Sequence, residues 1–134
     1  MVGSASFDRR KIQGSAAARE LFTDCFLWSG LAVENLWVAH VNEHNECVHL
    51  ERFAGDPTTA PYPLFEIVAG IAKHRSKGLV LAHNHPSGDP TPSPSDCQST
   101  RRLAAVVEAL GCEVLDHLIF GGKGWASFRE MGLL

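Results

Sequence analysis

Residues 78–96 read GLVLAHNHPSGDPTPSPSD, and this stretch decides both the fold class and the candidate site. Residues 78–82 form a short apolar run with the length and composition of a buried strand. In an extended segment alternate side chains share a face, so His83 and His85 point to the same side. Pro86 disfavours helical dihedrals at the residue before it and so keeps the second histidine extended. The sequence therefore predicts two imidazoles side by side at the carboxyl end of a buried strand.

Asp96 is the third candidate ligand, because the proline-rich loop before it can return its carboxylate to the histidines. Two histidines and one carboxylate leave a fourth coordination position for water, which is the arrangement of a catalytic zinc site rather than a structural one. Histidine and carboxylate ligands also bind iron, manganese or nickel. The ligand types therefore favour zinc without excluding these other metals.

The residues from Ser93 to Asp96 have a second interpretation, because they are also typical of a helix start. Ser93 fits the N-cap, Pro94 the first helical position and Asp96 the third. Capping alone would explain the serine and the aspartate in an ordinary helix. It does not explain a His-x-His pair at the end of a buried strand just before them. Both interpretations hold together if the aspartate caps the helix and also faces the histidines.

The pattern HxHP at residues 83–86, followed by SxxD at residues 93–96, resembles the JAMM signature of the JAB/MPN metalloprotease superfamily. More narrowly, three segments are similar to the bacterial RadC family: residues 81–93 (LAHNHPSGDPTPS), 116–121 (DHLIFG) and 127–129 (SFR). This resemblance runs from about residue 15 onward and is strongest after residue 78. It implies an α/β fold, a single cytidine-deaminase-like JAB/MPN domain with a mixed β-sheet flanked by helices.

The resemblance also implies a zinc-dependent metallopeptidase that hydrolyses an amide or isopeptide bond. Its metal ligands would be His83, His85 and Asp96, with a water on the zinc. Ser93 would donate a hydrogen bond to the developing oxyanion. A glutamate upstream would be the general base that activates the water and protonates the leaving amine.

Glu34 fits the family pattern for this base best, because it comes just before an apolar run at residues 36–39. Glu51, inside a predicted strand, and Glu66, near the start of a predicted helix, are the fallback candidates. A solvated surface acid is the simpler interpretation of both fallbacks. It is also an alternative for Glu34, which lies at a turn between a predicted helix and a predicted strand.

The remaining histidines divide into two groups. Four have no paired ligand spacing and are interpreted as structural: His40, His44, His49 and His74, the last at a helix end where a cation suits the dipole. His117 differs, because it lies on a predicted strand that could neighbour the site and support a ligand there.

Hydrophobic periodicity predicts a mixed α/β order. Helices are predicted over residues 15–28, 64–73 and 95–110, and strands over 36–41, 47–53, 78–82, 113–120 and 125–128. The first two strands are joined by a polar turn of hairpin length, which predicts an antiparallel pair. The polar residues 1–14 are interpreted as a flexible N-terminal leader, and residues 15–134 as one RadC-like JAB/MPN domain.

Composition limits the remaining classes of function. The chain has 134 residues, 45% of them hydrophobic and 20% charged, which suits one ordinary globular domain. No apolar run approaches the roughly 20 residues of a membrane helix, and the N-terminus lacks the apolar core of a signal peptide. The four cysteines contain no Cys-x-x-Cys pair and are expected to be reduced. We therefore expect a cytoplasmic protein without a membrane partner.

The expected partner is a peptide or protein substrate of unknown identity. Nucleic acid is an unfavoured partner, because twelve basic against fifteen acidic residues give a net charge of −3. Two alternative functions stay open at this point. One is a role associated with DNA repair, suggested by the family's name, and the other is a scaffold domain of the MPN type without proteolytic turnover.

Overall fold

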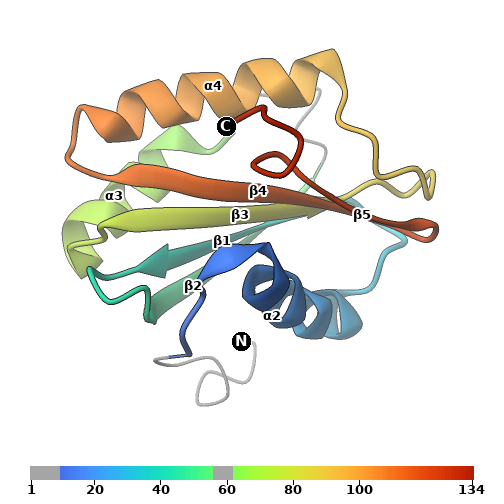
Figure 1. Cartoon of the computed structure of the whole chain (residues 1–134), viewed down its shortest axis with the longest axis horizontal. Coiled ribbons are helices and arrows are strands. Elements are labelled where there is room, and N and C mark those ends of the chain that lie inside the picture. The colour runs from blue at the N-terminus through green and yellow to red at the C-terminus, as the bar shows by residue number, and fades with distance from the viewer. Residues whose placement is uncertain (1–9, 56–61) are drawn as a thin grey trace.

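The computed structural model describes residues 10–55 and 62–134, which fold around one five-stranded sheet. The helices are α2 (Gly14–Ser29), α3 (Leu64–His74) and α4 (Pro94–Glu108), and the strands are β1 (Asn35–Val41), β2 (Cys47–Ala54), β3 (Gly78–Asn84), β4 (Glu113–Gly121) and β5 (Gly124–Ser127). Figure 1 shows α2 below the sheet and α4 above it. Across the described residues, no helix is both long and apolar enough to span a bilayer.

The sheet is mixed and has the strand order β2-β1-β3-β4-β5. β1 runs antiparallel to β2 and β3, β3 runs parallel to β4, and β4 runs antiparallel to β5. The parallel pair needs a crossover connection, which α4 supplies. Leu36, near the start of β1, pairs with His83, near the end of β3. The amino end of β1 and the carboxyl end of β3 therefore lie at the same edge of the sheet.

Apolar side chains cover both faces of the central strands, whose residues are all buried. Alternation along β1 places Trp37 and Ala39 in the core that α2 covers. Leu36 and Val38 lie in the other core, together with apolar residues of α3 and α4. The same alternation in β3 directs His83 toward the face that α3 and α4 cover.

The structure confirms the mixed α/β fold, and each predicted element is present with ends within two residues of those expected. The antiparallel pairing of β1 and β2 is also confirmed. The largest differences concern the site. β3 continues through Asn84, so His83 lies inside the strand, and α4 begins at Pro94 and ends at Glu108.

Residues 10–13 are more ordered than the expected leader. Lys11 forms an isolated antiparallel bridge with Glu46. Ile12 is 2% exposed and belongs to the core beneath α2, because its apolar side chain fills space beside the hairpin. The rest of the predicted leader, residues 1–9, lies outside the described residues.

Candidate metal centre

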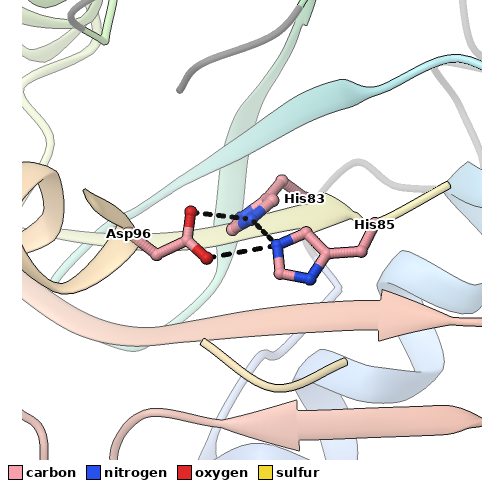
Figure 2. A group of neighbouring side chains, drawn as sticks. All are labelled: His83, His85 and Asp96. Carbon is pink, nitrogen blue, oxygen red and sulfur yellow. Dashed lines mark hydrogen bonds and ion pairs between the residues drawn. The ribbon is translucent and has the colours of Figure 1, made fainter. Parts of the chain in front are cut away.

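Three side chains converge at the edge of the sheet where β3 ends and α4 begins (Figure 2). His83 Nε2 lies 3.0 Å from His85 Nε2 and 3.3 Å from Asp96 Oδ1. His85 Nε2 lies 3.1 Å from Asp96 Oδ2. In the part of the chain that the structure describes, these residues form a group whose ligand atoms all lie within 4.8 Å of one another and could hold a metal ion.

The spacing of these atoms fits a single tetrahedral metal ion. With bonds of about 2.0–2.1 Å, tetrahedral geometry places two ligand atoms about 3.3 Å apart. The two imidazole nitrogens are 3.0 Å apart, close to that value, and the carboxylate approaches each of them with a different oxygen, at 3.3 Å and 3.1 Å. The donors are two imidazole nitrogens and a carboxylate, a set that zinc and several other transition metals bind. The residues present therefore fit a metal centre without identifying the metal.

A capping box at the start of α4 fixes the carboxylate. The backbone N–H of Asp96 donates to Ser93 Oγ at 3.0 Å, and the backbone N–H of Ser93 donates to Asp96 Oδ2 at 2.8 Å. Pro94 follows the cap in the first turn, where its fixed φ suits a helix. Asp96 therefore caps the helix and faces the histidines at once, so both interpretations of the SxxD pattern hold together.

Asp96 is held in its ionised form although it is 2% exposed. Burial alone would raise its pKa. The hydrogen bond and charge of His83, together with the two hydrogen bonds from Ser93, outweigh burial and lower the pKa well below its ordinary value. The carboxylate is therefore ionised at neutral pH, as a metal ligand has to be.

His85 is oriented by the loop that follows it. Its Nδ1 lies 2.8 Å from the backbone oxygen of Asp89, so this nitrogen donates and Nε2 turns toward the site. The loop returns against Gly121 of β4, where a Cβ would collide with the backbone of Gly88. Glycine at this position lets the loop pass close enough to hold the imidazole.

His83 is supported from behind by a second buried histidine. Its Nδ1 lies 2.7 Å from His117 Nε2, and His117 Nδ1 lies 2.7 Å from Thr100 Oγ1 in α4. The His117 ring stacks on Phe128, with 4.6 Å between the ring centroids. Burial, followed by the charge of His83, lowers the pKa of His117 well below its usual range and keeps it neutral. His117 thus lies beside the site, as its strand position suggested.

Glu34 lies one residue before β1, at the same edge of the sheet. Asn84, between the two ligand histidines, ties this segment down: its Oδ1 accepts from the backbone N–H of Asn35 at 2.8 Å. Its Nδ2 donates to the backbone oxygens of Leu31 and Val33, each at 3.1 Å. The backbone on both sides of Glu34 is therefore fastened to the ligand-bearing strand, and its role as the base stays a prediction.

The two fallback glutamates have different surroundings. Glu66 lies in the first turn of α3 and is exposed, as a solvated acid would be. Glu51 is not the solvated acid expected, because its side chain is 15% exposed and lies 2.8 Å from His40 Nε2. His40 pairs with Leu79, at the far end of β1 and β3 from the metal centre. Glu51 is therefore engaged away from the metal centre.

The histidines around Glu51 form a group that the sequence did not predict. We call His40, His49, His74 and Glu51 the second histidine cluster. The ring of His49 stacks on that of His74 at 4.0 Å, and its Nε2 lies 3.4 Å from Glu51 Oε1. Burial lowers the pKa of His74, so the cation expected at this helix end is disfavoured. The pairing of His40 opposite His49 in the hairpin was the signal that could have found the cluster.

Comparison with known proteins gives this architecture a family. A UPF0758 protein of Symbiobacterium thermophilum is 42% identical over 108 residues, which are 78% of this chain and 45% of the relative. A UPF0758 protein of Enterococcus faecalis is 39% identical over 102 residues, 75% of this chain and 44% of the relative. The UPF0758 protein YfjY of Escherichia coli is 37% identical over 107 residues, 79% of this chain and 67% of the relative.

The chain thus spans less than half the length of the first two relatives. A family model described as the RadC-like JAB domain matches residues 12–133, which include all the residues of the metal centre. The chain therefore belongs to the family of RadC-like JAB domains.

Proposed function

We propose that this domain is a zinc-dependent metallopeptidase that hydrolyses an amide or isopeptide bond of a peptide or protein. The observation that carries the proposal is the convergence of two imidazole nitrogens and one ionised carboxylate, with ligand atoms that all lie within 4.8 Å of one another. His83, His85 and Asp96 would hold the ion and leave a position for the reacting groups. Membership of the RadC-like JAB domains supports this reading of the site.

The chain's own residues would then divide the chemistry. A zinc ion at this site supplies a Lewis acid for the substrate carbonyl and lowers the pKa of the attacking water. Glu34, fixed beside β3, would accept a proton from that water and deliver it to the leaving amine. Ser93 Oγ accepts a hydrogen bond from the backbone N–H of Asp96, and its hydroxyl would turn from the carboxylate to donate to the oxyanion.

A peptide is a better partner for this site than nucleic acid. The net charge of −3 disfavours binding to a phosphate backbone. Exposed apolar side chains instead lie on the segment that leads into Glu34: Leu27, Trp28, Leu31 and Val33. Such side chains suit contact with a polypeptide.

The test combines metal content with hydrolysis. We expect one zinc ion per wild-type chain after dialysis, and its loss in both His83→Ala and Asp96→Ala. Hydrolysis is assayed on a library of internally quenched peptides that includes a branched lysine isopeptide. Glu34→Gln should keep the zinc and lose about 100-fold or more in kcat/KM.

Glu66→Gln is the matched control, because Glu66 is an exposed acid on α3 and its loss should leave both readouts unchanged. Stoichiometric zinc in both ligand variants would overturn the metal centre. A zinc-loaded wild type that cleaves nothing in the library would argue against the peptidase and for a scaffold.

A further inference from the structure

We propose that His117 and Thr100 are positioning residues that support His83 in the ring orientation and tautomer in which its Nε2 presents a lone pair to the metal. The inference rests on the proposed metal centre and is independent of peptidase turnover. It goes beyond the ligand set, because neither residue can reach the ion while His83 lies between. The two residues come from β4 and α4, the elements that follow the ligands in the chain.

The contacts of His83 limit which of its nitrogens carries a hydrogen. Its Nε2 faces Asp96 and His85, so Nδ1 is the nitrogen that faces His117 Nε2 at 2.7 Å. Two imidazole nitrogens at this distance share one hydrogen. If His83 donates it, Nε2 of His83 keeps a lone pair for a metal. If His117 donates it, the hydrogen of His83 has to lie on Nε2, where it blocks a metal.

A metal at Nε2 requires the first of these arrangements, and Thr100 completes it. A neutral His117 that accepts at Nε2 has its hydrogen on Nδ1 and donates it to Thr100 Oγ1, 2.7 Å away. A hydroxyl oxygen can accept this hydrogen bond, whereas a methyl group cannot. His83, His117 and Thr100 then form one chain in which each imidazole donates from its Nδ1.

The surroundings keep this relay in place. His117 and Thr100 are 0% and 1% exposed, so water does not compete for their hydrogen bonds. The Phe128 ring lies at 17° to the imidazole of His117 and prevents it from turning. Partners of this kind fix ring orientation in metal sites, and their loss typically lowers metal affinity about 10–100-fold.

The test reads the tautomers in the zinc-loaded protein, where the metal takes the lone pair of His83 Nε2. Long-range ¹H–¹⁵N correlation spectra of the zinc-loaded wild type should show His83 and His117 both protonated at Nδ1. Zinc affinity, measured by competition with a chelating dye, should fall about 10–100-fold in His117→Phe, which keeps the ring and loses both nitrogens. Cobalt(II) absorption should change in the same variant, because the ligand ring is no longer held.

Conservative variants separate positioning from packing. His117→Gln offers one acceptor and one donor and should restore part of the affinity. Thr100→Ser keeps the hydroxyl and should bind zinc like the wild type, whereas Thr100→Val should weaken it. His40→Phe is the matched control, because His40 is equally buried and bonded through both nitrogens at the far end of the sheet. Its zinc affinity should be unchanged whatever its stability.

The outcomes separate this inference from the proposed function. His117 protonated at Nε2 in the zinc-loaded wild type, or zinc affinity within twofold of wild type in a folded Thr100→Val, would overturn it. Should His117→Phe not fold, the wild-type spectra and the threonine pair decide. Tight zinc binding without turnover would count against the peptidase alone, and the tautomers would still stand as the evidence for the relay.

Discussion

The two ends of one sheet face each collect three imidazoles and one carboxylate, yet they differ as metal sites. The metal centre and its support contain His83, His85, His117 and Asp96, and the second histidine cluster contains His40, His49, His74 and Glu51. Of these two groups, the first alone offers ligand atoms close enough together to hold a metal in the described part of the chain.

The difference lies in where the lone pairs point. Two Nε2 atoms of the metal centre approach each other to 3.0 Å and share one carboxylate. In the second histidine cluster Glu51 divides its oxygens, with Oε2 at 2.8 Å from His40 and Oε1 at 3.4 Å from His49. The other nitrogen of His40 is engaged by Ser76 Oγ at 2.7 Å. A metal site therefore depends on convergence of unused lone pairs, and the number of imidazoles does not decide it.

The largest expected effect separates the two clusters by metal affinity. His85→Ala should weaken zinc binding more than about 100-fold, because it removes a ligand rather than a support. His49→Ala, the partly exposed counterpart in the second histidine cluster, should leave the zinc Kd unchanged. Competition titration with a chelating dye measures both. Equal losses in the two variants would mean that the second cluster also binds the ion.

The next prediction concerns the free energy of unfolding, to which the second histidine cluster should contribute strongly. His40→Ala should cost about 2–4 kcal/mol of unfolding free energy, because it opens a cavity and leaves Ser76 and Glu51 without their shared partner. His44→Ala, at a site 69% exposed, should change stability by less than about 0.5 kcal/mol. Urea unfolding of the metal-free protein measures both. Similar values for the two variants would show that the His40 network is not structural.

Low pH should reduce the stability of the fold through the second histidine cluster, in a defined pH window. Burial lowers the pKa of both His49 and His74 below the ordinary 6.5. The unfolded chain then binds more protons than the folded chain as pH falls below about 6.5, so stability is full above that pH and declines below it. Urea unfolding between pH 7.5 and 5 should show this decline. A His49→Gln, His74→Gln double variant should reduce the decline and leave the part that buried His117 contributes, and an unchanged slope would contradict the assignment.

The smallest effect concerns Tyr62, which lies beside His117, with 6.1 Å between the ring centroids. Its hydroxyl oxygen is buried near Thr100 and forms no hydrogen bond of ordinary geometry with a described residue, and burial raises its pKa. Tyr62→Phe should therefore be neutral or stabilise the fold by up to about 1 kcal/mol, since it removes an uncompensated polar group. Zinc affinity should not change. A weaker Kd would extend the relay from Thr100 to this tyrosine.

The parts of the site that could be predicted from the sequence depend on local rules. Alternation along a strand placed His83 and His85 on one side, and Pro86 limited the conformation at the second histidine. Capping chemistry placed Ser93 and Asp96 at the start of a helix. Each rule acts over a few residues, so contacts with distant parts of the chain change its outcome little.

The remaining parts depend on register between distant segments. The sequence placed His117 on a strand that could neighbour the site, but its contact with His83 requires the parallel register of β3 and β4, in which His83 lies opposite Ile119. The second histidine cluster needs the β1–β2 register and the docking of α3. Ile12 lies in the core next to the bridge between Lys11 and Glu46, and no pattern within this short polar segment predicts that bridge. No periodicity within one element carries this information.

The crossover β3–α4–β4 contains the three candidate metal ligands together with His117 and Thr100, whereas Glu34 comes from outside it. In the proposed function, metal binding and proton transfer would therefore be carried by separate stretches of the chain, which Asn84 joins through its hydrogen bonds. Such a layout is modular: replacing the segment that bears Glu34 would change the reaction at the ion while preserving the ligands that hold it. Relatives that retain the crossover and vary the preceding segment would share a metal without sharing a reaction.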